Sequence, residues 1–290
     1  MLMRRNVSII LLIIGLLILR FIIAGVLFHP ICAYGNPILV RLCIMLGSNV
    51  NFKTDKGITP LMGTVSFNDD PGVVKVLIDA GAEVNVGDID GVTPLMWAAS
   101  YSNNPEILEL LIENGAKVNI GDIDGMTPLI WAASDSNNLD VLKVLIDAGA
   151  EVNAKTKSGW TPLIWAVVEN KNLEIIKFLI NNGANVNARS EFGGTPLTYA
   201  AENNTNPEII KVLLEHGARI DYNQTKDGAT ALMFAAYANS NPEVVLTLLE
   251  AGANPKLKSK EGMLAVEYLE QFNEELKGTE AHQRLKELSY

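Results

Sequence analysis

A near-identical repetition with a period of 34 residues constrains this chain more than any other feature. Residues 87–100 read GDIDGVTPLMWAAS and residues 121–134 read GDIDGMTPLIWAAS. A Thr-Pro-Leu motif or a close variant recurs at spacings of 34, 34, 34, 34 and 35 residues, beginning at Thr59, Thr93, Thr127, Thr161, Thr195 and Thr230. A glycine follows each of these threonines by 22 residues, so the one extra residue falls between Gly217 and Thr230. A fixed period of this length indicates a solenoid of small stacked units.

Each unit is predicted to contain two short helices and a turn. Threonine before proline is a favoured N-cap, and proline suits the first helical position, so Thr93-Pro94 begins a helix A. Asn104-Pro105 begins a helix B in the same way, and Gly115 ends it. The following VNIGDIDG forms extended arms around a turn rich in Asp and Gly. Helix B is apolar on most sides, so each unit needs neighbours to bury it. The pattern therefore predicts an all-α repeat solenoid.

These residues resemble the ankyrin repeat. The pattern that carries the resemblance is G-x-T-P-L-x-x-A-A, a second helix, and then G-A-x-V-N-x-x-D. The resemblance implies an ankyrin-repeat stack, in which helix pairs carry β-hairpin loops and partner proteins bind on the concave face. It extends over residues 36–290. We predict a truncated first repeat at 36–54, six repeats starting near residues 55, 89, 123, 157, 191 and 226, and a C-terminal cap at 260–290.

The chain departs from the family pattern in two ways. Its period exceeds the usual length of roughly 33 residues, and the usual Gly-His link between helices A and B is replaced by SNNPE, SNNLD, NKNLE, NTNPE and NSNPE. The histidine that usually follows Thr-Pro-Leu is also replaced, by Met96, Ile130, Ile164, Thr198 and Met233. We expect the loss of this polar side chain to leave the contacts between repeats more apolar.

The N-terminus combines a basic flank with a long apolar run. Residues 1–6 contain Arg4 and Arg5, and residues 7–28 are apolar except for Ser8 near the start and Arg20. A run of this length can cross a hydrocarbon layer of roughly 30 Å, so an uncleaved transmembrane helix is favoured. A cleaved signal peptide with Ser8–Leu19 as its apolar region, or a soluble hydrophobic cap, remains open. The basic flank predicts a cytoplasmic N-terminus and an extracytoplasmic ankyrin domain, or a secreted or periplasmic product after cleavage.

Net charge restricts the partners. The formal charge is −10, and the three arginines of residues 1–35, which contain no acid, leave −13 for residues 36–290. Such a domain repels phosphate backbones, so we expect no nucleic-acid partner but a protein partner, one with a basic patch being favoured. The two cysteines, Cys32 and Cys43, are too few for a disulfide framework or a zinc site. Buried or free thiols are expected, and one Cys32–Cys43 bridge remains open.

No motif indicates catalysis. The aspartates of GDIDG lack the third ligand and the distant glutamate of a calcium-binding loop, so a turn is favoured. The histidines, His29, His216 and His282, are scattered, and His216 is expected to bond carbonyls at the end of a helix B. We therefore predict no enzyme activity, no cofactor, no metal and no small-molecule substrate.

Two sets of residues are candidates for partner contact. The first is a column of aromatic residues at one position of successive A helices: Trp97, Trp131, Trp165, Tyr199 and Phe234. These rings either pack between the A helices or form a partly exposed strip. The other set differs among the copies, so the fold does not dictate it, and its positions usually contact partners in the family. This second set lies in the turns, at the residue before each repeated threonine, and at the ends of the A helices. Its selected members are Phe67, Ile89, Asp90, Val92, Ser100, Tyr101, Ile123, Asp124, Met126, Asp135, Trp160, Glu169, Phe192, Glu202 and Tyr237.

The sequence thus predicts a non-catalytic scaffold for protein–protein interaction. The favoured form is tethered to a membrane through residues 7–28 and binds a partner through the concave face and the hairpin tips. The alternative is a cleaved and secreted ankyrin-repeat inhibitor or effector.

Overall fold

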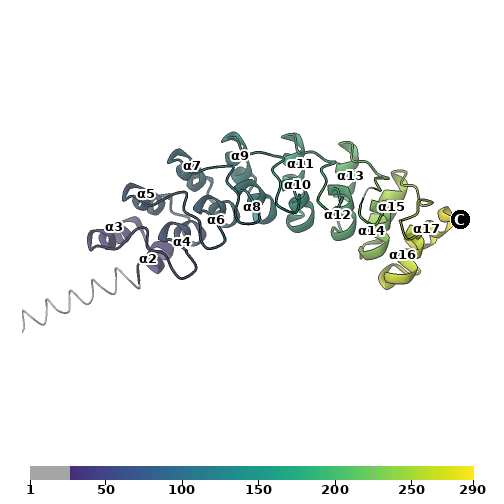
Figure 1. Cartoon of the computed structure of the whole chain (residues 1–290), viewed down its shortest axis with the longest axis horizontal. Helices are drawn as coiled ribbons and strands as arrows, with labels where there is room; N and C mark the ends of the chain where they lie inside the picture. The colour runs from purple at the N-terminus through teal and green to yellow at the C-terminus, as the bar shows by residue number, and fades with distance from the viewer. Residues whose placement is uncertain (1–26, 224) are drawn as a thin grey trace, which may run out of the picture. The chain divides into compact units, whose positions relative to one another are not determined.

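The computed structural model describes residues 27–223 and 225–290 of the chain. These residues divide into two compact units. Unit 1 holds the described residues up to Ile123 together with Asp140–Ala150, and unit 2 holds Asp124–Leu139 together with Glu151–Tyr290. Figure 1 shows the helices of each unit in two layers, one of A helices and one of B helices.

Unit 1 contains three A helices and four B helices among its described residues. The A helices are α2 (Phe28–Tyr34), α4 (Pro60–Phe67) and α6 (Pro94–Tyr101). The B helices are α3 (Pro37–Met45), α5 (Pro71–Asp79), α7 (Pro105–Glu113) and α9 (Leu139–Asp147). Along the A layer α2 packs on α4 and α4 on α6, and along the B layer α3 packs on α5 and α5 on α7.

Unit 2 repeats this arrangement. Its A layer contains α8 (Pro128–Asp135), α10 (Pro162–Trp165) with the π-helix η2 (Ala166–Asn170), α12 (Pro196–Asn203), α14 (Ala231–Ala238) and α16 (Ala265–Phe272). Its B layer contains α11 (Leu173–Asn181), α13 (Pro207–Glu215), α15 (Pro242–Glu250) and α17 (Glu280–Ser289), with a short 3₁₀ turn η3 (Glu274–Leu276) before α17. Each layer again packs helix on helix in chain order.

The start signals of the helices act as the sequence predicts. Thr93 accepts a hydrogen bond from the backbone N–H of Met96 at the start of α6, and Asn104 accepts one from Glu106 at the start of α7. Leu95 and the alanine pair of α6 are fully buried, and small alanines let the neighbouring A helix approach. The all-helical repeat fold is therefore confirmed for the described residues.

The repeat domain begins earlier than the sequence analysis predicts. Helix α2 is the A helix of the first repeat, so this repeat is not truncated at residue 36. Phe28 was assigned to the end of the apolar run at 7–28, but it is 1% exposed and belongs to α2, which packs on α4. The rest of the run, up to residue 26, lies outside the described residues. Among the helices that are described, none is long and apolar enough to cross a membrane.

The loops are turns and not β-hairpins, because no strand occurs in residues 27–223 and 225–290. Most arms close with one backbone hydrogen bond, as from Asp88 N to Val92 O at 3.1 Å. Within each unit, neighbouring tips are joined by a backbone N–H···O bond, and we call this series the tip ladder. Its members are Ile89 to Lys56 and Ile123 to Asp90 in unit 1, and Lys157 to Asp124, Glu191 to Ser158, Lys226 to Phe192 and Lys260 to Asp227 in unit 2.

The asparagine of the G-A-x-V-N motif joins successive repeats. Asn187 donates from Nδ2 to the carbonyl oxygen of Gly217 at 2.9 Å, and its Oδ1 accepts from the backbone N–H of Arg219 at 2.9 Å. The same pair of bonds is made by Asn51, Asn85 and Asn153. We call this the asparagine bridge. It satisfies two backbone groups at the end of each following helix B, where the helix leaves carbonyls without partners.

Asp221 stands where the asparagine bridge would recur, so we expect Asp221→Asn to stabilise unit 2. Asp221 Oδ1 accepts from Asn254 N at 2.9 Å, but a carboxylate has no N–H to donate to Gly252. Restoring the second bond should raise the free energy of unfolding by about 1 kcal/mol. Urea unfolding of the full chain, followed by tryptophan fluorescence, measures the change. The reciprocal change Asn187→Asp should lower the midpoint; equal midpoints for both variants and the wild type would remove the role of the bridge.

A second set of asparagine side chains forms polar contacts between repeats. These contacts compensate for those expected to be lost with the family's histidine. At the end of α14, Asn239 donates to the carbonyl oxygens of Ala201 and Asn204 at 2.8 and 2.9 Å. Equivalent side chains of both units also reach back to the preceding repeat: Asn68, Asn170, Asn204 and Asn273. The prediction of more apolar contacts therefore holds only at the A-helix position, where Met96 and Ile130 are fully buried.

Candidate functional site: an aromatic and acidic surface on the A helices

The aromatic column lies at the edge of the core. All five rings are half-buried, so each packs on neighbours with one part and meets solvent with another. In the described residues, the indole N–H groups of Trp97 and Trp165 are buried and have no hydrogen-bond partner. The column thus packs between the A helices with some ring atoms and exposes other atoms of the same rings as a strip.

In unit 1 the column is extended by exposed rings at the ends of the A helices. Trp97 stacks on Tyr101, with ring centroids 5.4 Å apart, and Tyr34 lies 5.9 Å from Phe67. Tyr101 is 53% exposed and Phe67 64% exposed. These aromatic pairs therefore present ring surface to solvent beside the A helices.

In unit 2 the ring of Trp160, the residue before Thr161, packs against rings of the aromatic column. Trp160 lies between Trp165 and Tyr199, with centroid distances of 4.9 and 4.8 Å. Gly194 makes room for this cluster, because a Cβ at this position would lie 2.7 Å from the Tyr199 ring. The sequence analysis placed Trp160 in one candidate set and Trp165 and Tyr199 in the other, but in the structure the three rings form one cluster.

Two adjoining hollows lie between the last A helices and the tips of unit 2, and we call them together the tip groove. Their volumes are about 280 and 270 Å³, and they share Asp227 and Phe234. The first is lined by Phe192, Gly194, Thr198, Tyr199, Glu202, Thr225, Lys226, Asp227 and Phe234. The second is lined by Asp227, Ala229, Met233, Phe234, Tyr237, Glu261 and Tyr268. Aromatic rings and carboxylates therefore face the same space.

The electrostatics of the tip groove favour a cationic guest. Burial raises the pKa of the Glu202 carboxyl above its usual value, only partly opposed by the hydrogen bond from Asn203. Asp227 and Glu261 add two further carboxylates, against the single ammonium group of Lys226, which lies 4.2 Å from the centroid of the Phe192 ring. A basic side chain from a partner would place its aliphatic stem on the rings and its charge beside Glu202.

The structure leaves most of the predicted contact residues accessible. Exposed side chains are Phe67, Ile89, Asp90, Tyr101, Ile123, Asp124, Asp135, Glu169, Phe192 and Tyr237, and half-buried ones are Met126, Trp160 and Glu202. Val92 and Ser100 differ, being 8% and 9% exposed. Val92 follows the turn that Asp88 closes, and Ser100 lies on the packed side of α6, so neither offers a contact surface.

The sequence analysis missed the end of the aromatic surface in α16. Tyr237 makes edge contacts with Tyr268 and Phe272, with centroids 6.3 and 5.3 Å apart. Tyr268 stands 34 residues after Phe234 and so continues the column in register. Extending the period of 34 residues into the predicted C-terminal cap would have identified Tyr268 as a member of the column.

The cysteines, histidines and paired aspartates have structural places. Cys32 and Cys43 are free and buried, and burial together with the neighbouring thiol raises the pKa of Cys32 to about 12. His216 donates from Nδ1 to Val212 O at 2.8 Å, as predicted for the end of a helix B. Asp88 accepts from the backbone of Asp90 and Val92, which fits the turn. In the part of the chain that the structure describes, no three His, Cys, Asp or Glu side chains gather as a metal site would need.

Comparison with known proteins gives one result at the level of the family. The family model described as ankyrin repeats (3 copies) matches residues 28–122, 99–190 and 167–259. These overlapping matches cover most of the chain and begin at α2. No curated protein matches the chain.

Proposed function

The chain belongs to the ankyrin-repeat family, and we propose that it is a non-catalytic scaffold that binds a partner protein through its A-helix face and loop tips. Ankyrin repeats are in general modules for protein–protein interaction and are typically non-catalytic. The observation that carries the proposal is the tip groove, where half-buried and exposed aromatic rings and several carboxylates line the same hollows. Tyrosine and tryptophan are favoured anchors of interfaces.

The partner presents a basic segment to this surface. Glu202 is partly removed from water, and a nearby cation would stabilise its charged form. Lysine or arginine side chains also pack well on exposed rings such as Tyr237. The acidic charge of the chain attracts such a partner at a distance, and the rings hold it at contact.

Replacing Tyr237 by alanine is expected to weaken partner binding by about tenfold or more, because interface aromatics commonly contribute more than 1 kcal/mol. The partner is first identified by photo-crosslinking from residue 237 in the native membrane fraction, followed by mass spectrometry. Its affinity for the wild-type and variant chains is then measured with purified proteins. Tyr290→Ala is the matched control, since Tyr290 is also exposed but lies outside the groove. Equal affinities of the two variants would overturn the assignment of the groove.

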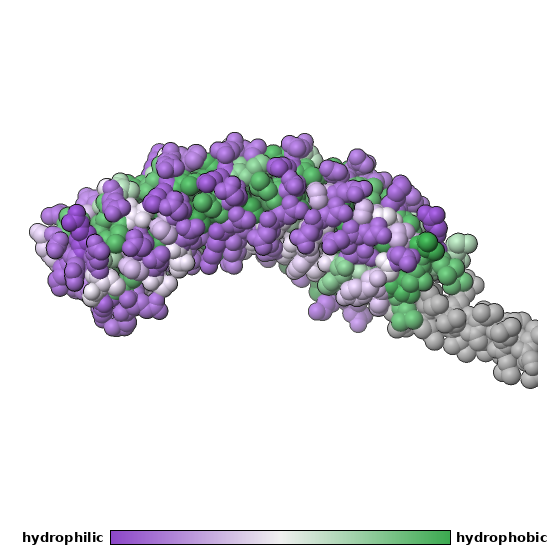
Figure 2. All heavy atoms as spheres, turned by 180° about the vertical axis from the view of Figure 1, so that it is seen from behind, coloured by the Kyte–Doolittle hydropathy of each residue, from purple (hydrophilic) through white to green (hydrophobic). Residues whose placement is uncertain are grey.

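We also propose that the domain is tethered to a membrane through the apolar run at residues 7–28, of which the part up to residue 26 enters the bilayer. Support comes from the first repeat: on α3, Ile38 is 81% and Met45 78% exposed, although solenoids usually end in polar caps. Figure 2 shows apolar atoms gathered at this end of unit 1. No acid precedes Asp55 in the sequence, which suits an anionic lipid surface.

The basic N-terminal flank places the ankyrin domain outside the cytoplasm in this proposal. An N-terminal peptide that includes Arg4 and Arg5, recovered from carbonate-washed membranes, is the expected result. Protease added to sealed cells should digest the ankyrin domain of the tethered form. A mature chain that begins after residue 28 and occurs in the soluble fraction would instead establish the alternative, a secreted ankyrin-repeat inhibitor or effector.

A further inference from the structure

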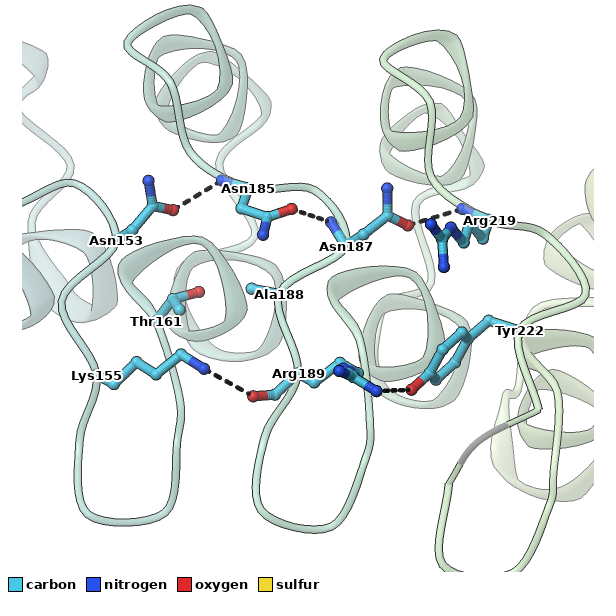
Figure 3. Close-up of a pocket in the computed structure, with 9 residues that line it drawn as sticks. All are labelled: Asn153, Lys155, Thr161, Asn185, Asn187, Ala188, Arg189, Arg219 and Tyr222. Carbon is cyan, nitrogen blue, oxygen red and sulfur yellow. Dashed lines mark hydrogen bonds between the residues drawn. The ribbon is translucent and has the colours of Figure 1, made fainter.

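Another hollow lies in unit 2, away from the tip groove. Its volume is about 700 Å³, and it spans the arms of three successive repeats (Figure 3). Three cationic side chains line it, from Lys155, Arg189 and Arg219, and no carboxylate does. This concentration of positive charge occurs on a chain whose formal net charge is −10.

The walls of the hollow are held by hydrogen bonds. Along one side, backbone N–H groups donate to asparagine side chains. Asn185 N donates to Asn153 Oδ1 at 2.8 Å and Arg219 N to Asn187 Oδ1 at 2.9 Å between successive arms, and Asn187 N donates to Asn185 Oδ1 at 2.9 Å within one arm. Along the other side, Lys155 Nζ donates to Arg189 O at 3.3 Å, and the Arg189 guanidinium donates to the Tyr222 hydroxyl at 3.3 Å (Figure 3). The side chains of Lys155 and Arg189 are thus held by hydrogen bonds before any guest binds.

The three cations have no anionic partner in the described chain. The ion pairs of the described residues involve other side chains, such as Lys177 with Glu174 on α11 and Lys211 with Glu208 on α13. Lys155 and Arg189 bond only neutral oxygens, which leaves their charge uncompensated. Charge-assisted bonds from a guanidinium to a carboxylate are stronger than such neutral contacts and can form as parallel pairs.

The stack itself does not require these cations. Lys155 and Arg189 occupy the same position of successive repeats, and the two repeats before Lys155 have Gly121 and Gly87 at this position. Both glycines occupy the same arm of the same fold, so the arm forms without a basic side chain. Formation of the arm therefore does not explain the basic side chains of Lys155 and Arg189.

We propose that this hollow binds an extended acidic segment of a partner protein, whose carboxylates pair with Arg189, Lys155 and Arg219 in turn. An extended segment fits because the cations come from different arms of the stack, along the row of repeats, and do not converge on one point (Figure 3). The asparagine side chains and the Tyr222 hydroxyl provide bonds to the backbone of such a segment. This surface is separate from the tip groove and opposite to it in charge preference, so the inference stands apart from the proposed function.

A fluorescein-labelled hexaglutamate peptide tests the inference. Its anisotropy is titrated with the full chain in neutral detergent micelles, at low and at moderate salt. We expect saturable binding that Arg189→Gln weakens by about tenfold or more and Lys155→Gln by a smaller factor. Lys177→Gln removes the same charge from the B-helix surface of unit 2 and should leave the affinity unchanged. Arg189→Lys, which keeps the charge but loses the fork, should fall between the wild type and Arg189→Gln.

Three outcomes would overturn the inference. The first is the absence of binding by the wild-type chain. The second is an equal loss in Lys177→Gln and Arg189→Gln, which would show that the peptide senses only the net charge. The third is displacement of the peptide by an equal concentration of inorganic phosphate, which would show a site for a single anion. The urea midpoint of Arg189→Gln is compared with that of the wild type, and Arg219→Gln supplies a second variant if Arg189→Gln unfolds early.

Discussion

Replacing Asn239 by alanine is expected to lower the free energy of unfolding of unit 2 by about 3 kcal/mol. The side chain is 1% exposed and makes three hydrogen bonds, two to carbonyl oxygens of the preceding repeat and one from the backbone N–H of Asn241. Alanine leaves these backbone groups buried without this partner, and each such group costs about 1–3 kcal/mol. The urea midpoint of the full chain, read from tryptophan fluorescence, should fall clearly.

Asn203→Ala is the matched control for this prediction. Asn203 is exposed near the end of the preceding A helix, where its amide donates to Tyr199 O at 3.1 Å. Water can replace this bond, so a change within about 0.5 kcal/mol is expected. If Asn239→Ala shifted the midpoint no more than Asn203→Ala, Asn239 and its equivalents after the other A helices would not join the repeats in the way described above.

Replacing Gly159 by alanine should also destabilise unit 2, by about 1–3 kcal/mol more than the same change at Gly183. Both glycines have positive φ, +77° and +90°, so both variants carry the cost of a left-handed backbone, about 1–2 kcal/mol. Only at Gly159 would the new Cβ approach the neighbouring tip, 3.0 Å from Glu191 N. The methyl group would push apart the tips that the bond from Glu191 N to Ser158 O joins.

Gly183→Ala separates conformational strain from crowding, because nothing lies within 4 Å of its added Cβ. Hydrogen exchange of the Glu191 amide gives a second readout, since this N–H should lose protection in Gly159→Ala alone. Equal midpoints in the two variants, with an unchanged Glu191 amide, would show that the tip ladder adds nothing to stability.

The helix boundaries were predictable because their signals are local. A threonine or asparagine before proline satisfies the first N–H groups of a helix whatever the rest of the chain does, and Thr93 and Asn104 behave in this way. The first repeat was placed wrongly because α2 has no such cap: Leu27 precedes Phe28, and no side chain bonds the helix start. Apolarity alone could not separate the A helix from the run before it.

The candidate surface was predictable in its register but not in its contacts. The period fixes which rings share a position, yet the placing of Trp160 between Trp165 and Tyr199 depends on side-chain angles and on the space left by Gly194. The asparagine bridge was missed because its bonds join residues 30 and 32 positions apart, although the asparagine itself is part of the repeated motif in most copies.

The tip ladder consists only of backbone atoms. Ile89, Lys157, Glu191 and Lys226 all donate the same N–H, although their side chains are apolar, basic, acidic and basic. A substitution at a tip that avoids proline therefore keeps the ladder, whereas the glycine beside each tip is restricted by its positive φ. Mutation of a tip, or duplication of a repeat, can therefore change the side chains that the tips expose at little cost in folding, one repeat at a time.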